Sequence, residues 1–134
     1  MGQQQLLLIV LGVIIVGIAV VVGINLFNAN AEESTKDTIV SEGTNIGALA
    51  QQFYKKPKAL SGGGNSFSTG GLNNAGFVIP LALQNTQSAK WQQTTKDSAL
   101  YVCTGTPTDA AYNAVWKVTV TVTPNSISSL VAPK

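Results

Sequence analysis

The chain has 134 residues, of which only 10% are charged, and its formal net charge at pH 7 is +2. All eight cations are lysine, and the chain has neither histidine nor arginine. It therefore lacks histidine as a general base and metal ligand, and arginine as a bidentate ligand for phosphate. A charge this small, with no basic patch among aromatic residues, does not indicate nucleic-acid binding. We therefore expect no enzyme activity, no cofactor, no metal and no specific nucleic-acid partner.

The most informative stretch is the apolar run Leu6–Ile24, which has nineteen residues and no charge, hydroxyl or amide side chain. As a helix it would extend roughly 28 Å, close to the hydrocarbon thickness of a bilayer. Apolar residues lie on every side of this helix, so it is not an amphipathic helix resting on a core. The polar remainder of the chain is too small to bury it. Lipid, other copies of the chain, or both in turn must surround it.

Three interpretations of this run are open. Ala29-Asn30-Ala31 resembles the cleavage site of a secretory signal peptide, but no lysine or arginine precedes the run, and the run is longer than a usual signal core. A plain single-pass membrane anchor is the second interpretation. The third, which we favour, is an N-terminal helix that resides first in the membrane and then in the core of a filament.

Small residues interrupt the run at Gly12, Gly17 and Gly23. Ala19 and Gly23 form a small-xxx-small pair, which permits close approach between helices, and we expect this pair to contribute to assembly. Glycine and β-branched residues both weaken a helix. We therefore predict a loosened helix between Val16 and Gly23 in the assembled state.

Helical periodicity continues beyond the apolar run. One narrow stripe recurs at alternating spacings of four and three, at Ile39, Gly43, Ile46, Ala50 and Phe53. Asn30 could cap a new helix, but no proline or turn cluster separates the two halves, so we predict one continuous helix. Pro57 ends this helix after two lysines. The first domain is therefore residues 1–56, in which 1–24 form the hydrophobic membrane or filament-core segment.

The remainder is predicted to be a connector and a small sheet. Residues 57–76 are glycine-rich and predict a flexible connector, without the Lys-Ser/Thr ending of a phosphate loop. Residues 77–134 are predicted to form a small β domain. We expect short strands at 77–83, 87–95, 99–104, 114–123 and 127–131, the first weakened by Pro80. Short connections imply an antiparallel meander. The predicted fold class is α+β: a long N-terminal helix, hydrophobic then amphipathic, packed against a small antiparallel sheet.

Side chains that carry chemistry are few. Four of the six acids fall on the predicted helix, where we expect them to be solvated: Glu32, Glu33, Asp37 and Glu42. No group of acids and cysteine has the spacing of metal ligands. Cys103 is the only cysteine, which excludes an intramolecular disulfide, and it lies in an apolar strand. We expect it to be a small buried hydrophobe.

An uncharged apolar N-terminal helix that continues into an amphipathic half and then a small antiparallel sheet resembles the type IV pilins. The layout covers the whole chain, whereas the matching sequence is confined to residues 1–30. In that family a leader is removed after a glycine, the new N-terminus is N-methylated, and a glutamate four residues later pairs with the amine of a neighbouring subunit. The order of helix and sheet resembles the bacterial members. The family's usual C-terminal disulfide loop is absent, since Cys103 has no partner.

The resemblance implies roles for Met1 and Gln5. We favour Met1 as the mature, N-methylated terminus, which places Gln5 where the family has its glutamate. An amide accepts a hydrogen bond from the amine but does not cancel its charge, which is costly in an apolar core. The other frame cuts between Gly2 and Gln3 and places Leu7 at the fifth position.

The resemblance implies a structural subunit that polymerises through its N-terminal hydrophobic helix into a type IV pilus-like filament. The expected assembly residues are Met1, Gln5, Ala19 and Gly23. The expected partners are identical subunits, the inner membrane before assembly and the pilus assembly machinery, and the final location is an extracellular pilus on the cell surface. The alternative is a membrane-anchored extracytoplasmic β-domain that binds a ligand and does not polymerise.

Overall fold

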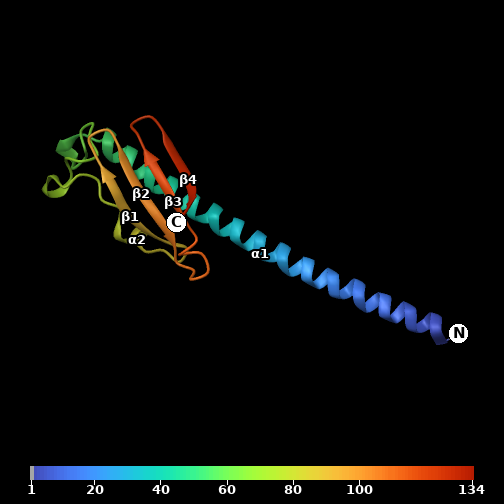
Figure 1. The fold of residues 1–134 in the computed structure, drawn as a ribbon. Coiled ribbons are helices and arrows are strands. Elements are labelled where there is room, and N and C mark those ends of the chain that lie inside the picture. The colour runs from blue at the N-terminus through green and yellow to red at the C-terminus, as the bar shows by residue number, and fades with distance from the viewer. Residues whose placement is uncertain (1) are drawn as a thin grey trace. The chain divides into compact units, whose positions relative to one another are not determined.

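The computed structural model describes residues 2–134 and confirms the α+β fold class (Figure 1). Contacts divide the chain into two compact units, one ending at Thr35 and the other comprising Lys36–Lys134. We call the first unit the N-terminal segment and the second the head. Met1, the expected mature terminus, lies outside the described residues.

Helix α1 comprises Gly2–Lys55, which confirms the prediction of one continuous helix. No new helix begins at Asn30, because no proline there removes a backbone donor and α1 runs through this position. The end is set by Pro57: the Lys56 amide still donates to the Gln52 carbonyl at 3.0 Å, and the chain then leaves the helix. Residues 16–23 are helical here, while the loosening that we predict there concerns the assembled state.

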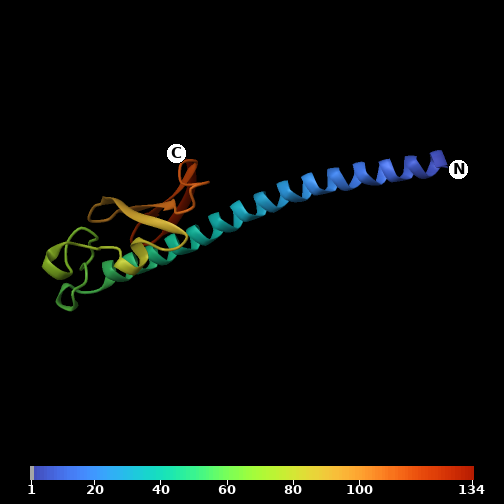
Figure 2. The same ribbon diagram turned by 90° about the horizontal axis from the view of Figure 1, so that it is seen from below.

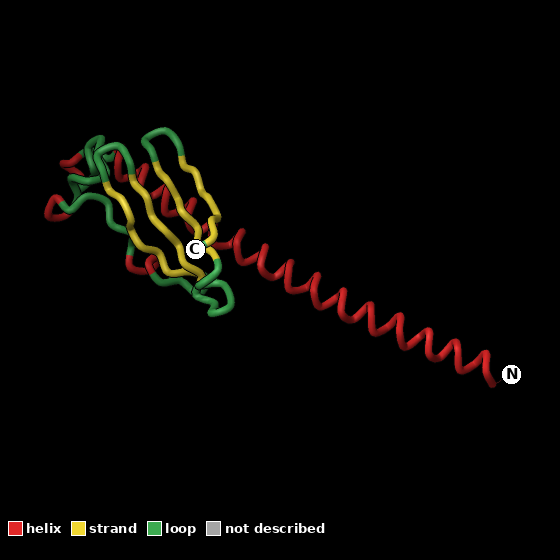
Figure 3. The backbone as a smooth tube through the Cα atoms, viewed as in Figure 1, coloured by secondary structure: helices red, strands yellow, loops and turns green. Residues whose placement is uncertain are grey.

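The head contains an antiparallel meander, as predicted, and its four strands lie in the order β1-β2-β3-β4 (Figure 3). Its strands are β1 (Ala89–Lys96), β2 (Tyr101–Pro107), β3 (Trp116–Val122) and β4 (Ile127–Pro133). Residues of β2 and β3 alternate between buried and half-buried, because one face of the sheet covers the helix. The register of β1 shifts between Gln93 and Thr95, which marks a bulge.

The predicted strand over residues 77–83 is wrong. Phe77 donates its amide to the Phe67 carbonyl at 2.8 Å, and the chain then forms the short helix α2 (Leu81–Gln84). The reason is Pro80, whose φ of −53° suits the start of a helix and whose carbonyl accepts from Leu83 at 2.8 Å. The buried apolar side chains of this segment pack against the connector and the core instead of within the sheet.

The core lies between the second half of α1 and one face of the sheet. Figure 2, seen from below, shows this part of the helix lying along the sheet. The predicted helix stripe is buried at Ile39, Gly43, Ile46 and Ala50, and Phe53 packs against the same core while half-buried. Opposite them lie the buried hydrophobic side chains of the sheet, which are Ala89, Trp91, Tyr101, Cys103, Trp116, Val118, Val120 and Val122. The predicted packing of helix stripe on sheet is therefore confirmed.

The glycine-rich connector is more ordered than its composition predicts. It contains two short 3₁₀ helices, η1 (Lys58–Leu60) and η2 (Leu72–Asn74), and its amides fold back onto the end of α1. Gly63 donates to the Phe53 carbonyl at 2.7 Å and Asn65 to the Tyr54 carbonyl at 2.8 Å, which satisfies carbonyls that a helix end leaves unpaired. Phe67 inserts fully into the core. The connector thus caps α1 and contributes to the head.

Candidate functional site

The candidate site is the exposed apolar surface of the N-terminal segment. Seventeen large apolar side chains between Leu6 and Phe27 are each 53–75% exposed. Fully burying one such side chain stabilises by about 1.5–3 kcal/mol, so leaving all of them in water would cost on the order of tens of kcal/mol. One helix among the described residues, α1, contains a stretch apolar and long enough to cross a membrane. This segment is compatible with membrane anchoring.

The predicted assembly residues lie at two places along this helix. Gln5 is exposed near its start, and Ala19 and Gly23 are exposed about one turn apart on one face. Fourteen positions separate Gln5 from Ala19, which is about 21 Å along the axis, so a single chain does not bring them together. Any joint role therefore needs more than one copy.

Gly12, which was not among the predicted assembly residues, belongs to the same face. At about 100° per residue, Gly12, Ala19 and Gly23 fall within about 40° of one another around the helix. A Cβ added at Gly12, Gly17 or Gly23 would meet nothing within 4 Å in the single chain. Helical projection of the small residues, rather than a search for one four-residue spacing, would have found this stripe.

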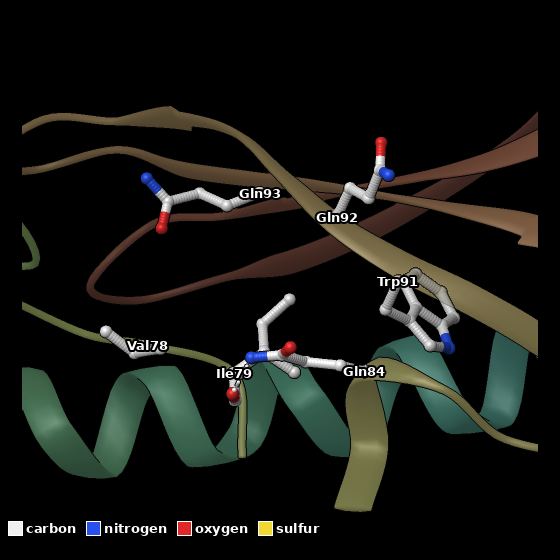
Figure 4. A pocket seen from close by; sticks show the side chains of 6 residues that line it. All are labelled: Val78, Ile79, Gln84, Trp91, Gln92 and Gln93. Atoms are coloured by element: carbon white, nitrogen blue, oxygen red, sulfur yellow. Dashed lines mark hydrogen bonds between the residues drawn. The ribbon is translucent and has the colours of Figure 1, made fainter. Parts of the chain in front are cut away.

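The head carries a shallow groove at the β1 edge of the sheet (Figure 4). It has a volume of about 390 Å³ and is lined by Val78, Ile79, Gln84, Trp91, Gln92 and Gln93. None of these side chains titrates near neutral pH, and two of them are already engaged. Gln84 donates its amide to the Ile79 carbonyl at 2.8 Å, and Trp91 donates its indole N–H to Glu42 at 3.2 Å.

Glu42 connects α1 to the sheet, contrary to the expectation that it is a solvated acid. One carboxylate oxygen, Oε2, accepts from Thr86 Oγ1 at 2.9 Å as well as from Trp91. Thr86 in turn accepts from the Ala89 amide at 3.0 Å, which holds the turn before β1. The sequence offered no signal for these contacts, because they join residues 44 and 49 positions apart.

Cys103 is fully buried, as predicted, and burial raises the pKa of its thiol from 9.0 to about 12. Burial also raises the pKa of Tyr101, with a smaller contribution from Cys103. A thiol held neutral in this way is a poor nucleophile. Among residues 2–134, the buried Tyr101 hydroxyl and Trp116 indole N–H have no hydrogen-bond partner, and no three potential metal ligands lie together.

We expect Cys103 to react with a thiol reagent at pH 8 only after unfolding. The unfolded thiol ionises from about pH 9 and the folded one from about pH 12, so the folded state loses stability as the pH rises between these values. Cys103→Val should reduce this pH-dependent loss in the free energy of unfolding. The part of the loss that is due to Tyr101 should remain. Labelling of the native protein as rapid as that of the protein in denaturant would contradict the burial.

Comparison of this chain with protein-family models, with curated proteins and with solved structures gives no match.

Proposed function

We propose that this protein is the structural subunit of a type IV pilus-like filament, which polymerises through the N-terminal segment. The observation that carries the proposal is the exposed apolar surface between Leu6 and Phe27, which is continuous around the helix. Lipid satisfies this surface before assembly, and the same segments of neighbouring copies satisfy it in the filament core. The heads then form the outer surface.

The small residues favour a polymer over a plain anchor. Each glycine costs a helix about 1 kcal/mol relative to alanine, and lipid contacts give no return for that cost. Close packing between helices compensates for this cost, because the missing side chain lets two helix backbones approach each other. Gly12, Ala19 and Gly23 share one face and are open in the single chain. We therefore assign these small residues to contacts between copies.

The remaining steps follow from the proposed polymer. The N-terminal segment resides in the inner membrane until the pilus assembly machinery extracts it into the growing fibre on the cell surface. Met1 is the mature terminus and carries the N-methyl group. The helix between Val16 and Gly23 loosens in the fibre, and a filament map with unbroken helical hydrogen bonding there would contradict this detail.

Electron microscopy of cells that produce the protein together with a pilus assembly system tests the proposal. We expect fibres many subunits long that an antibody against the head decorates along their length. The second candidate, an anchored binding domain that uses the groove at β1, predicts antibody only at the cell envelope and no fibres. Envelope labelling without fibres would therefore overturn the proposal.

We expect Gln5→Leu to reduce filament yield and Gln5→Glu to preserve or increase it. In the proposed core the Met1 amine of a neighbour needs an acceptor, and the helix dipole is unfavourable to its positive charge. Leaving a buried donor unpaired costs about 1–3 kcal/mol, and more for a charged one. Gln4→Leu is the matched control, since Gln4 is an equally exposed neighbouring amide. Normal yield from Gln5→Leu would show that Gln5 is only a spacer.

A further inference from the structure

The two borders of the sheet differ in how they are protected against pairing with another strand. At β1, an isolated bridge between Asn85 and Lys90 covers the start of the outer edge, and the bulge near Thr94 interrupts the strand. Lys90 and Lys96 add two like charges. Bridges, bulges and lysines are the devices by which proteins block edge-to-edge association.

Strand β4 has none of these devices. It forms the opposite border of the sheet (Figure 3), and its seven residues carry no charge. All seven pair with β3 in an uninterrupted register, and its proline is the last residue. Ser128, Ser129 and Leu130 are exposed at its centre. Such a regular, neutral edge presents unpaired backbone groups to any strand that fits.

The register shows which backbone groups of β4 point outward. Beyond one end of the ladder, Thr123 donates to the Ser126 carbonyl at 2.8 Å, and beyond the other, Lys134 donates to the Val115 carbonyl at 3.0 Å. These two residue pairs, Thr123 with Ser126 and Val115 with Lys134, are therefore hydrogen-bonded pairs. Hydrogen-bonded pairs alternate with non-hydrogen-bonded pairs along two antiparallel strands.

Counting from either end gives the same result. Ile127, Ser129 and Val131 occupy non-hydrogen-bonded positions against β3, so their N–H and C=O groups point away from the sheet. Within residues 2–134, no other backbone segment hydrogen-bonds to these three residues. Pro133 falls at the same kind of position, where its missing N–H costs no bond within the sheet.

We propose that β4 pairs antiparallel with β4 of a second copy, centred on Ser129. In this register Ser129 lies opposite Ser129 of the second copy, and Ile127 lies opposite its Val131, so every outward N–H meets an outward C=O. No like charges oppose each other, and β-branched residues pair at both ends, which is favourable across strands. The two four-stranded sheets become one continuous sheet. The contact is isologous, with the same surface on both copies.

This pairing has a consequence that rests on the proposed function. A two-fold axis normal to the sheet reverses the direction of the helical residues 36–55 in the second copy. Subunits within one filament share a single direction, so the β4 contact does not form within a filament. It joins heads of two filaments that run in opposite directions, and it therefore produces lateral bundles.

Cysteine cross-linking of the full chain in detergent micelles tests the pairing. Opposed Cα atoms at a hydrogen-bonded position lie about 5.5 Å apart, within the range that a disulfide bridges. We expect Ser129→Cys to form a covalent dimer on mild oxidation in at least tenfold greater yield than Ser128→Cys. Ser128 is equally exposed, but the proposed register displaces it from its counterpart by two residues, beyond the roughly 7 Å limit.

A charge pair extends the test to fibres. We expect Ser129→Lys to remove both the bundling of filaments and the dimer in micelles. The control Ser128→Lys should leave both unchanged. A mixture of Ser129→Lys and Ser129→Glu chains should restore the dimer. Equal cross-linking at 128 and 129, or a disulfide that forms only between Ser129→Cys and Gln93→Cys chains, would overturn the pairing. The micelle assay needs no filament, so a chain that dimerises through Ser129→Cys but never forms fibres would refute the proposed function alone.

Discussion

Deletion of Leu6–Ile24 is expected to abolish both membrane retention and filament formation, and to leave a soluble head that is no larger than the proposed β4-paired dimer. The deletion removes fifteen of the seventeen exposed large apolar side chains that lie between Leu6 and Phe27. It leaves the core intact, because every buried residue of the core lies at or beyond Ile39. Fractionation of cells, electron microscopy and sedimentation of the purified product measure the three outcomes.

A single charge provides a sharper version of the same experiment. Ile14→Lys places an ammonium near the middle of the apolar run, where insertion into a bilayer costs about 2.5–3.5 kcal/mol. Asn28→Lys is the matched control, since it adds the same charge to the same exposed helix beyond the run. We expect fibres from the control only. Fibres from the deletion variant would show that the heads polymerise without a hydrophobic core.

Gly43→Ala is expected to destabilise the head by about 1–3 kcal/mol, the usual cost of overpacking a core. A Cβ at this position would lie 2.5 Å from Val120 Cγ2 and 2.6 Å from Trp91 Cη2, so the sheet and helix would have to move apart. For a unit of this size, that loss corresponds to a fall in Tm on the order of 10 °C. Thermal unfolding of the full chain in micelles, followed by tryptophan fluorescence, measures it.

Gly17→Ala serves as the matched control, because it is the same substitution in the same helix with nothing within 4 Å. We expect it to leave the Tm of the head unchanged. If Gly43→Ala also left the Tm unchanged, the close packing of α1 against Trp91 would be wrong. A loss of filaments in Gly17→Ala, with an unchanged head, would place its cost in the assembled state.

Patterns of local period predicted most of the fold. Apolar residues recur at every second position in Trp116–Val122 and at spacings of three and four from Ile39 to Ala50. The strand and the helix could therefore be recognised without knowledge of what each packs against. The exposed apolar run was equally clear, because no face of it is polar. Its glycines are open in the single chain, and their role in the proposed filament could be inferred only from helical projection.

The parts that could not be predicted depend on contacts between distant residues. Phe67 stands among glycines and serines, and only the folded connector shows that it is buried. Glu42 is one of four acids on the helix, and its two donors arrive from another element. The unprotected edge at β4 also needed the order of strands, since its neutral composition fits an interior strand as well as a border.

The folded connector also determines where foreign residues can be added to the head. At Gly63 a Cβ would lie 1.9 Å from the Ser66 carbonyl oxygen, and at Gly70, where φ is +95°, it would lie 2.2 Å from the Gly62 carbonyl oxygen. An epitope inserted there would dismantle the cap of α1, although glycine-rich stretches are the usual choice for insertion. Residues 109–111, in the turn between β2 and β3, are all exposed, and they are the better position for an affinity tag or a fluorescent label.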